Sequence, residues 1–321
     1  MLKYTLRRLA GVIPKLIAIT VICFVMMELM PGDAFTRSVS YDVLEEMSDY
    51  EIAMRRAEMG LDKPAVYRYF KWLFDICRGD LGNSIVDGLP VADKLAVALP
   101  YTMELSAYAL LLSAILGLSA GFLSAIFKNT VLDYTFNTIS VFGHAMPEFF
   151  YAMGFVVIFS LKLGWLPEGL RVPPGTMDPT FWDRLPHLVL PVSAMTYSLF
   201  SGGQRYTRTS MLDVLNKDYI KTARSKGLNE FTVNVKHAFR NATTPVMTML
   251  VMRLPQLVGG SFVIEQVFSY PALGTLSLGA TKAGDVAMAL IGTCMTGAMM
   301  LIASTLVDLF AAMLDPRVRF D

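Results

Sequence analysis

The chain contains few charged residues, few cysteines and no motif that would hold a nucleotide or a metal. Charged residues make up 17% of its 321 residues, whereas a soluble domain carries roughly 25%. Its three cysteines include no CxxC pair, which argues against a zinc site or a disulfide framework. No Walker A sequence (G-x-x-x-x-G-K-S/T) is present, and none of the three histidines stands in HExxH. With a net charge of +1, nothing favours a nucleic-acid partner.

The composition instead indicates an integral membrane protein. A transmembrane helix needs about 20 mostly apolar residues, and 54% of the chain is hydrophobic. The apolar runs that we expect to cross the bilayer are residues 9–30, 101–127, 134–161, 188–203, 242–264 and 286–307. The fourth run, at roughly 24 Å, is shorter than the ~30 Å hydrocarbon core. To span it, the run needs the preceding Leu185 and Pro186, or shielding from lipid by neighbouring helices. No cleavage site follows the first run, so we interpret it as a retained span.

Basic residues predict the orientation of these spans. Lys3, Arg7 and Arg8 precede the first run, and residues 204–240 carry eight Lys or Arg against three acids. Cytoplasmic loops are enriched in Lys and Arg, so both regions belong in the cytoplasm, and six spans place the C-terminus there too. The expected fold is therefore all-α, with residues 1–30 containing the first span, 31–99 outside, and 100–321 forming a core with a cytoplasmic loop at 204–243.

The outer segment has helix signals of its own. Ser48 and Glu51 match a capping box, and the helix that they open is expected to end near Gly60. A second helix can begin at Pro64, and its apolar residues recur at helical spacing. Such an amphipathic helix could lie on the membrane, meet a partner, or pack on the spans.

The cytoplasmic loop is organised as a short helix. Asp218 is a favoured N-cap residue because its carboxylate can accept hydrogen bonds from free backbone N–H groups. Gly227 suits the left-handed position that follows a helix. Between them, Tyr219, Ile220 and Ala223 make a small apolar patch at helical spacing. The pattern predicts a helix of about two turns, roughly 12 Å long.

A second helix is expected to follow directly. Asn229 can cap it, and the apolar face would contain Phe231, Val235, Ala238 and Phe239. A short helix held between longer ones suits docking into a groove, where Lys221, Arg224 and Lys226 could meet acidic groups of a partner. The alternative is a solvated loop that merely follows the positive-inside rule.

The same loop carries a resemblance to a known family. Residues 218–246 read DYIKTARSKGLNEFTVNVKHAFRNATTPV, which resembles the EAA loop of binding-protein-dependent ABC permeases of the dipeptide, oligopeptide and nickel branch. Ala223 and Gly227 match the general pattern, whereas Lys221 and Thr222 stand where Glu and Ala are usual. Stretches from LKYTLRRLAGVIP to the closing DPRVRF resemble, in order, the B-type permease of type I ABC importers.

The resemblance implies a role for the loop and a set of partners. In this family the loop forms a coupling helix that sits in a cleft of the ATPase subunit. The implied coupling residues are Asp218, Tyr219, Lys221, Thr222, Ala223, Arg224, Lys226 and Gly227. The implied partners are a second, related permease that completes a heterodimer, two ATPase subunits that bind ATP and Mg, and an extracytoplasmic substrate-binding protein.

The expected function is import of di- or oligopeptides by alternating access, across a bacterial or archaeal cytoplasmic membrane. The chain itself is expected to be no enzyme and to hold no cofactor or metal. Import of nickel or a metallophore is the alternative within the family. A secondary transporter is the alternative from another class, but it predicts an inverted repeat with broken helices, and none is evident.

One short string resembles the signature of ABC ATPases and is interpreted differently. SGGQR, at residues 201–205, ends an apolar run, and the chain has no phosphate cradle to accompany it. Gly202 and Gly203 are therefore expected to permit close helix packing or a bend.

Four polar residues within or beside the apolar runs are candidates for the translocation path: His144, Glu148, Arg253 and Glu265. His144 and Glu148 are i,i+4 on the third run and are therefore expected to share a face, with a kink possible at Pro147 between them. A charged side chain at the bilayer centre costs about 3 kcal/mol or more, so such groups face the protein interior or water. Glu148 and Arg253 could line the path or form a structural pair. Glu265 could belong to an outer gate or anchor the helix at the interface.

Overall fold

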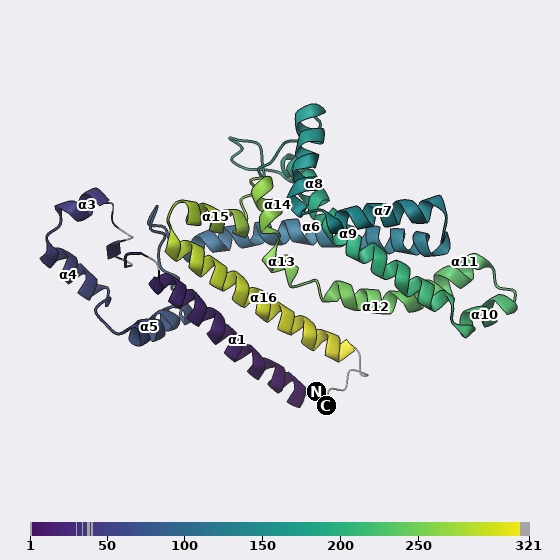
Figure 1. The fold of residues 1–321 in the computed structure, drawn as a ribbon, viewed down its shortest axis with the longest axis horizontal. Helices are drawn as coiled ribbons and strands as arrows, with labels where there is room; N and C mark the ends of the chain where they lie inside the picture. Colours follow the sequence, from purple (N-terminus) through teal and green to yellow (C-terminus); the bar gives the residue numbers. More distant parts are fainter. Residues whose placement is uncertain (1, 30, 34, 37–38, 40, 315–321) are drawn as a thin grey trace. The chain divides into compact units, whose positions relative to one another are not determined.

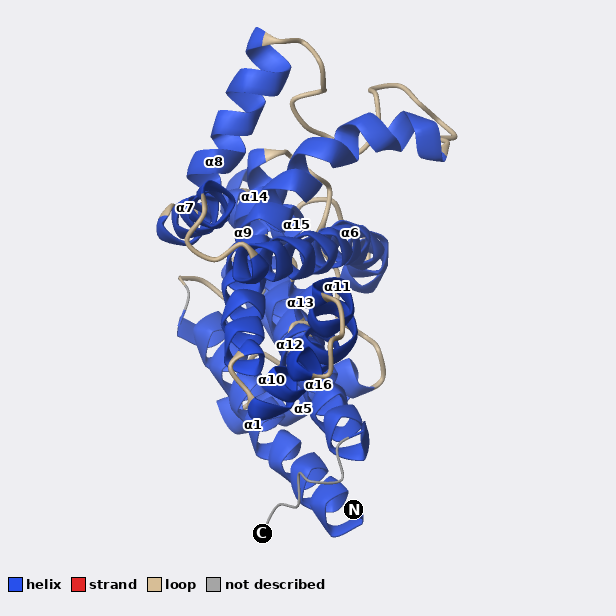
Figure 2. Ribbon diagram, turned by 90° about the vertical axis from the view of Figure 1, so that its right-hand side faces the viewer, coloured by secondary structure: helices blue, strands red, loops and turns tan. Residues whose placement is uncertain are grey.

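The computed structural model describes residues 2–29, 31–33, 35–36, 39 and 41–314. Across that part of the chain the regular structure is helical, without a strand (Figure 1, Figure 2). The helices fall into two compact units, one containing residues up to 101 with 272–305, and the other built on residues 102–271. The expected all-α class is confirmed.

The first unit contains the N-terminal end of the described chain and most of its last helix. Its elements are α1 (Leu2–Leu29), α3 (Tyr41–Glu46), α4 (Asp49–Glu58), α5 (Ala65–Cys77), the start of α6 (Val91–Ile126), α15 (Leu273–Lys282) and most of α16 (Val286–Leu314). The predicted capping box is present: Ser48 accepts from the Glu51 N–H, and the Glu51 carboxylate accepts from the Ser48 N–H. A core of Val91, Leu95, Leu273, Met288 and Ile291 joins α6, α15 and α16.

The second unit is built around one long helix. Its elements are the rest of α6, α7 (Val131–Ala145), α8 (Glu148–Phe155), η1 (Val156–Lys162), α9 (Phe181–Leu215), α10 (Asp218–Ser225), α11 (Glu230–Thr232), η2 (Val233–Phe239), α12 (Arg240–Val251), α13 (Gln256–Gly259) and α14 (Phe262–Val267). Helix α9 packs against α7, α8, α12 and α14. It therefore carries most of the tertiary contacts of this unit.

Small residues bring α9 into backbone contact with α6. A Cβ added at Gly117 would lie 3.3 Å from the Gly203 backbone, and one added at Gly121 would lie 2.5 Å from Thr207 Cβ. Such close approach is the known use of small residues between membrane helices. The SGGQR string thus lies inside α9 and opens no helix, and the expectation of close packing at Gly203 is confirmed.

The third expected span is not one straight helix. The chain turns by 111° between α7 and the helix formed by Glu148–Lys162. Met146 is extended, at φ −86 and ψ 139, and Pro147 follows it. Proline lacks an N–H and disfavours the α-helical conformation in the residue before it, so the helix ends there. The prediction of a continuous helix over 134–161 is wrong at this point.

Three described helices are long and apolar enough to cross a membrane on their own: Ala10–Leu29, Val91–Ile126 and Met288–Leu309. Two bent pairs raise the number to five, if the 111° pair and the 43° pair of Glu230–Val251 with Gln256–Val267 each count as one crossing. The short fourth run lies within the 35-residue α9, which is not among the helices that qualify by length and apolar composition. Six crossings, and the side on which each terminus lies, stay predictions.

Candidate functional sites in the second unit

The loop between α9 and α12 contains the predicted short helix. Helix α10 has eight residues, Asp218–Ser225, and Gly227 follows it with φ +77, as expected for a glycine after a helix. The predicted N-cap is displaced by one residue. Lys217 is the N-cap, and Asp218 is the first helical residue, where its carboxylate accepts a hydrogen bond from Lys221 Nζ at 2.9 Å.

Helix α10 is anchored from one side and open on the other. Ile220 and Ala223 are buried in a cluster with Met211 of α9 and with Val233 and Ala238 of η2. Tyr219 does not join them, because it is 47% exposed. The expected single patch of Tyr219, Ile220 and Ala223 is therefore two surfaces, one facing the core and one facing away from it.

Three large apolar side chains are exposed on the surface of the loop. Tyr219, Leu228 and Phe231 are all exposed, Phe231 by 75%. Asn229 caps the second helix as expected, since its side chain accepts from the Thr232 N–H at 2.7 Å. The face predicted for that helix is partly wrong. A π-helical stretch follows. Ala238 turns inward as predicted, but Val233 is buried in place of Val235, and Phe231 points away from the core.

The charges of the loop largely pair within it. Lys221 pairs with Asp218, and Arg224 Nε and Nη2 lie 2.9 and 3.3 Å from the two carboxylate oxygens of Glu230. Both pairs are on the surface, and exposed pairs contribute about 0–1 kcal/mol. Because these pairs are weak, Lys221 and Arg224 can break them at little cost and pair with acidic groups of another protein. Thr222 is also exposed, but its hydroxyl donates to the Asp218 carbonyl at 3.0 Å.

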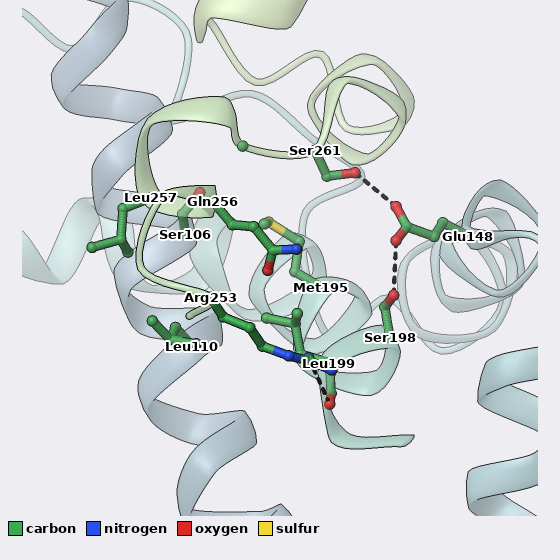
Figure 3. A pocket seen from close by; sticks show the side chains of 11 residues that line it. Ser106, Leu110, Glu148, Met195, Ser198, Leu199, Arg253, Gln256, Leu257 and Ser261 are labelled. Carbon is green, nitrogen blue, oxygen red and sulfur yellow. Dashed lines mark hydrogen bonds between the residues drawn. The ribbon is translucent and has the colours of Figure 1, made fainter. Parts of the chain in front are cut away.

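A second candidate site is a small polar cavity where α6, α8, α9 and the turn from α12 to α14 meet (Figure 3). Its volume is about 70 Å³, enough for one or two waters. The residues that line it are Ser106, Leu110, Glu148, Met195, Ser198, Leu199, Arg253, Gln256, Leu257, Gly260 and Ser261. Two of the four predicted path residues, Glu148 and Arg253, are thus brought to one cavity.

Glu148 and Arg253 are held by different partners. Each carboxylate oxygen of Glu148 accepts one hydroxyl hydrogen bond at 2.7 Å, from Ser198 and from Ser261. Arg253 Nη1 donates to the Leu199 carbonyl at 3.2 Å. Within the described residues these two side chains form no ion pair, so the structural-pair alternative is not observed. The cavity instead presents one negative and one positive group separately (Figure 3).

The other two predicted path residues lie elsewhere. His144 is exposed near the end of α7 and, because of the turn at Pro147, it shares no helix face with Glu148. Glu265 is 1% exposed and accepts a hydrogen bond from Thr102 Oγ1 at 3.1 Å. Such complete burial does not fit an interfacial anchor. It places Glu265 in the interior beside Gly260, next to the cavity but outside its lining.

Several residues of the site are not evident from the sequence. Ser106, Ser198, Gln256 and Ser261 come from separate elements and meet only through the fold. Gln204 of α9 lies outside the lining of the cavity, but it is fully buried, and neither side-chain polar atom has a hydrogen-bond partner among the described residues. The feature of the sequence that could have indicated this burial is its position directly after two glycines.

A further cluster outside this cavity was also missed. Glu104 accepts from Arg171 Nε and Nη2 at 3.1 Å each, from Arg184 Nη1 at 3.2 Å and from the Tyr270 hydroxyl at 3.2 Å. It ties the segment before α9 to the turn after α14. No spacing in the sequence connects positions so far apart.

Comparison with known proteins assigns the family. Residues 117–320 match the binding-protein-dependent transport system inner membrane component, and residues 1–106 match the N-terminal membrane component of such systems. The chain belongs to this family. The oligopeptide transport system permease protein AppB of Bacillus subtilis is 35% identical over 321 residues, which cover 100% of both chains. The glutathione transport system permease protein GsiC of Pectobacterium atrosepticum is 33% identical over 320 residues, again 100% of both chains.

As a member of this family, the chain is a multi-pass inner-membrane permease subunit of an ABC transporter. The EAA-type loop is accordingly the segment α10–α11, which the structure anchors on α9 and η2. The resemblance read from residues 218–246 is confirmed at the level of the family. The roles of the individual residues in the loop and in the cavity stay predictions.

Proposed function

We propose that this chain is a channel-forming subunit of an ATP-driven, binding-protein-dependent importer of di- or oligopeptides. Its partners would be a second, related permease, two ATPase subunits and an extracytoplasmic substrate-binding protein. ATP and Mg would bind to the ATPase subunits, and this chain would change between inward-open and outward-open states. The peptide substrate is supported by relatives that are named as permeases of oligopeptide and glutathione transport systems.

The observation that carries the proposal is the two-sided construction of α10. Its inner side, Ile220 and Ala223, is fixed to the end of α9, while Tyr219, Leu228 and Phe231 stand exposed beside it. Large exposed apolar side chains on a helix that is itself packed against the protein core are typical of a protein interface. A force applied to this surface would reach α9 directly, because Met211 of α9 packs on the same cluster.

The polar cavity supports a path for a zwitterionic substrate. Glu148 and Arg253 offer opposite charges that are not neutralised by each other. A peptide carries an ammonium and a carboxylate, which match such a pair in sign. At about 70 Å³ the cavity is too small for a dipeptide, so the proposal requires this region to widen during transport.

The test is purification of the chain at native expression in mild detergent, followed by reconstitution into vesicles. We expect a second permease and ATPase subunits to co-purify, and labelled peptide to enter only with ATP and the binding protein. Nickel uptake in the same vesicles is the matched comparison. Uptake without ATP or ATPase subunits would contradict the proposal, and uptake of nickel but not of peptides would refute its substrate.

A further inference from the structure

Helix α5 lies against the end of α1 within the first unit. The Phe24 ring of α1 packs edge-on against Tyr69, with ring centroids 5.4 Å apart, and lies 5.8 Å from Trp72. One turn further along α1, Glu28 accepts a hydrogen bond from Arg68 Nη2 at 2.6 Å. Apolar and charged contacts together fix the position of α5 along α1.

This position sets the depth of α5 in the bilayer. The apolar part of α1 is Ala10–Leu29, so Phe24 lies roughly 8 Å inside its end at a rise of about 1.5 Å per residue. Interfacial amphipathic helices lie about 5–10 Å deep, at the boundary of headgroups and acyl chains. The outer stripe of α5 fits this place, because Val66, Phe70 and Phe74 recur every four residues and are all exposed.

A cavity of about 530 Å³, in the size range of ligand pockets, is lined by residues of α1, α4 and α5 and of the segments that follow α1 and α4. It is lined by Phe24, Met27, Glu28, Gly32, Asp33, Arg56, Met59, Gly60, Leu61, Arg68, Lys71, Trp72 and Asp75. One part of the lining is therefore aromatic and aliphatic, and the other carries three acids and three bases. This composition suits a ligand that is itself part apolar and part charged.

Among the described residues, two of the six charged side chains that line the cavity have no ion-pair partner. Two pairs neutralise four of the six charged side chains: Arg56 with Asp33, and Arg68 with Glu28. Lys71 and Asp75 form no ion pair in the part of the chain that the structure describes. They are i,i+4 on α5 and both line the cavity. In addition, Arg68 Nε is buried and has no acceptor among the described residues.

We propose that this cavity binds the headgroup of a zwitterionic phospholipid such as phosphatidylethanolamine. Lys71 and Arg68 Nε would donate to the phosphate, and Asp75 would accept from the ammonium group. The acyl chains would continue along the exposed stripe of α5, at the depth fixed by Phe24. An anionic lipid fits less well, because it lacks the ammonium that Asp75 requires.

The test is lipid binding to the full chain in the complex with which it purifies, after removal of bound lipid in detergent. Native mass spectrometry would count bound palmitoyl-oleoyl phosphatidylethanolamine and, in parallel, phosphatidylglycerol with the same chains. We expect the ethanolamine lipid to be retained at least about fivefold better. The double variant Lys71→Ala/Asp75→Ala should weaken its binding by about tenfold, as for loss of charge-assisted hydrogen bonds.

The control is Asp62→Ala/Lys63→Ala, which removes the same two residue types from an exposed pair outside the cavity lining. This control should bind lipid like the wild type, and both variants should melt at the wild-type temperature. Equal retention of the two lipids, or unchanged binding by Lys71→Ala/Asp75→Ala, would overturn the proposal. Displacement of the lipid by trialanine would assign the site to free peptide instead. The readout needs no transport, so it is independent of the proposed function.

Discussion

Replacement by alanine should have different effects at two adjacent residues of α10: one substitution should weaken binding, and the other should lower stability. Tyr219 is 47% exposed, and Ile220 is fully buried in the cluster that fixes α10 to α9. Tyr219→Ala therefore removes an exposed side chain and leaves the buried cluster intact. Ile220→Ala leaves the exposed surface unchanged but removes side-chain volume from the buried cluster.

The magnitudes follow from burial. Replacing a buried Ile by Ala costs about 2–5 kcal/mol because a cavity is left behind, so Ile220→Ala should lower the melting temperature of the chain. A surface substitution changes the unfolding free energy by about 0.5 kcal/mol or less, so Tyr219→Ala should melt like the wild type. If Tyr219 contacts an ATPase subunit, its loss should cost about 1–2 kcal/mol of binding, or about 5- to 30-fold in Kd.

The assay pairs thermal melting of the purified chain with titration of the ATPase subunits onto it. Tyr50→Ala is the control, because Tyr50 is an exposed tyrosine on α4 of the other unit. The expected result is weakened binding and transport for Tyr219→Ala, with an unchanged melting temperature. Unchanged ATPase binding by Tyr219→Ala, with normal transport, would refute the assignment of this surface as the docking face.

Three further substitutions test other features. Gly121→Ala should destabilise the chain by about 1–3 kcal/mol, because its Cβ would lie 2.5 Å from Thr207 Cβ. Gly154→Ala, within α8 and with open space around it, should instead melt at or slightly above the wild-type temperature, because Ala favours the helix over Gly by about 0.5–1 kcal/mol. Asn229→Ala should cost about 1 kcal/mol through loss of the N-cap, and Asn229→Asp should restore the melting temperature. Glu148→Gln keeps an oxygen acceptor for one serine and should change stability by less than about 1 kcal/mol; undiminished peptide uptake by this variant would show that its charge is dispensable.

Local signals in the sequence were the dependable ones. The capping box at Ser48 and Glu51, the cap at Asn229 and the left-handed glycine at 227 depend on residues within three or four positions of each other. Their geometry is decided by the backbone of one turn, so the sequence contains what is needed. Close packing at Gly203 was predictable for a similar reason, since a glycine pair within an apolar run has few other uses.

Tertiary geometry was beyond the sequence. The i,i+4 spacing of His144 and Glu148 has meaning only in an unbroken helix, and Pro147 sits between them. The burial of Val233 in place of Val235 depends on a π-helical stretch whose period differs from that of an α-helix. The two serines that bind Glu148 are 50 and 113 positions away along the chain, and only the fold brings them together.

The backbone contact between α6 and α9 makes α9 a lever with a fixed pivot. No side chain stands between Gly117 and Gly203, so the crossing point has nothing that can yield by changing rotamer. Leu215, at the loop end of α9, lies roughly 18 Å from this pivot, and Ser198, at the cavity, lies roughly 8 Å on the other side. A tilt that moves the loop end by about 5 Å therefore moves the cavity wall by about 2 Å in the opposite direction. A large movement at the loop end therefore becomes a smaller movement with greater force at the cavity. This suits an ATPase that pushes on the loop and a narrow polar cavity that has to open.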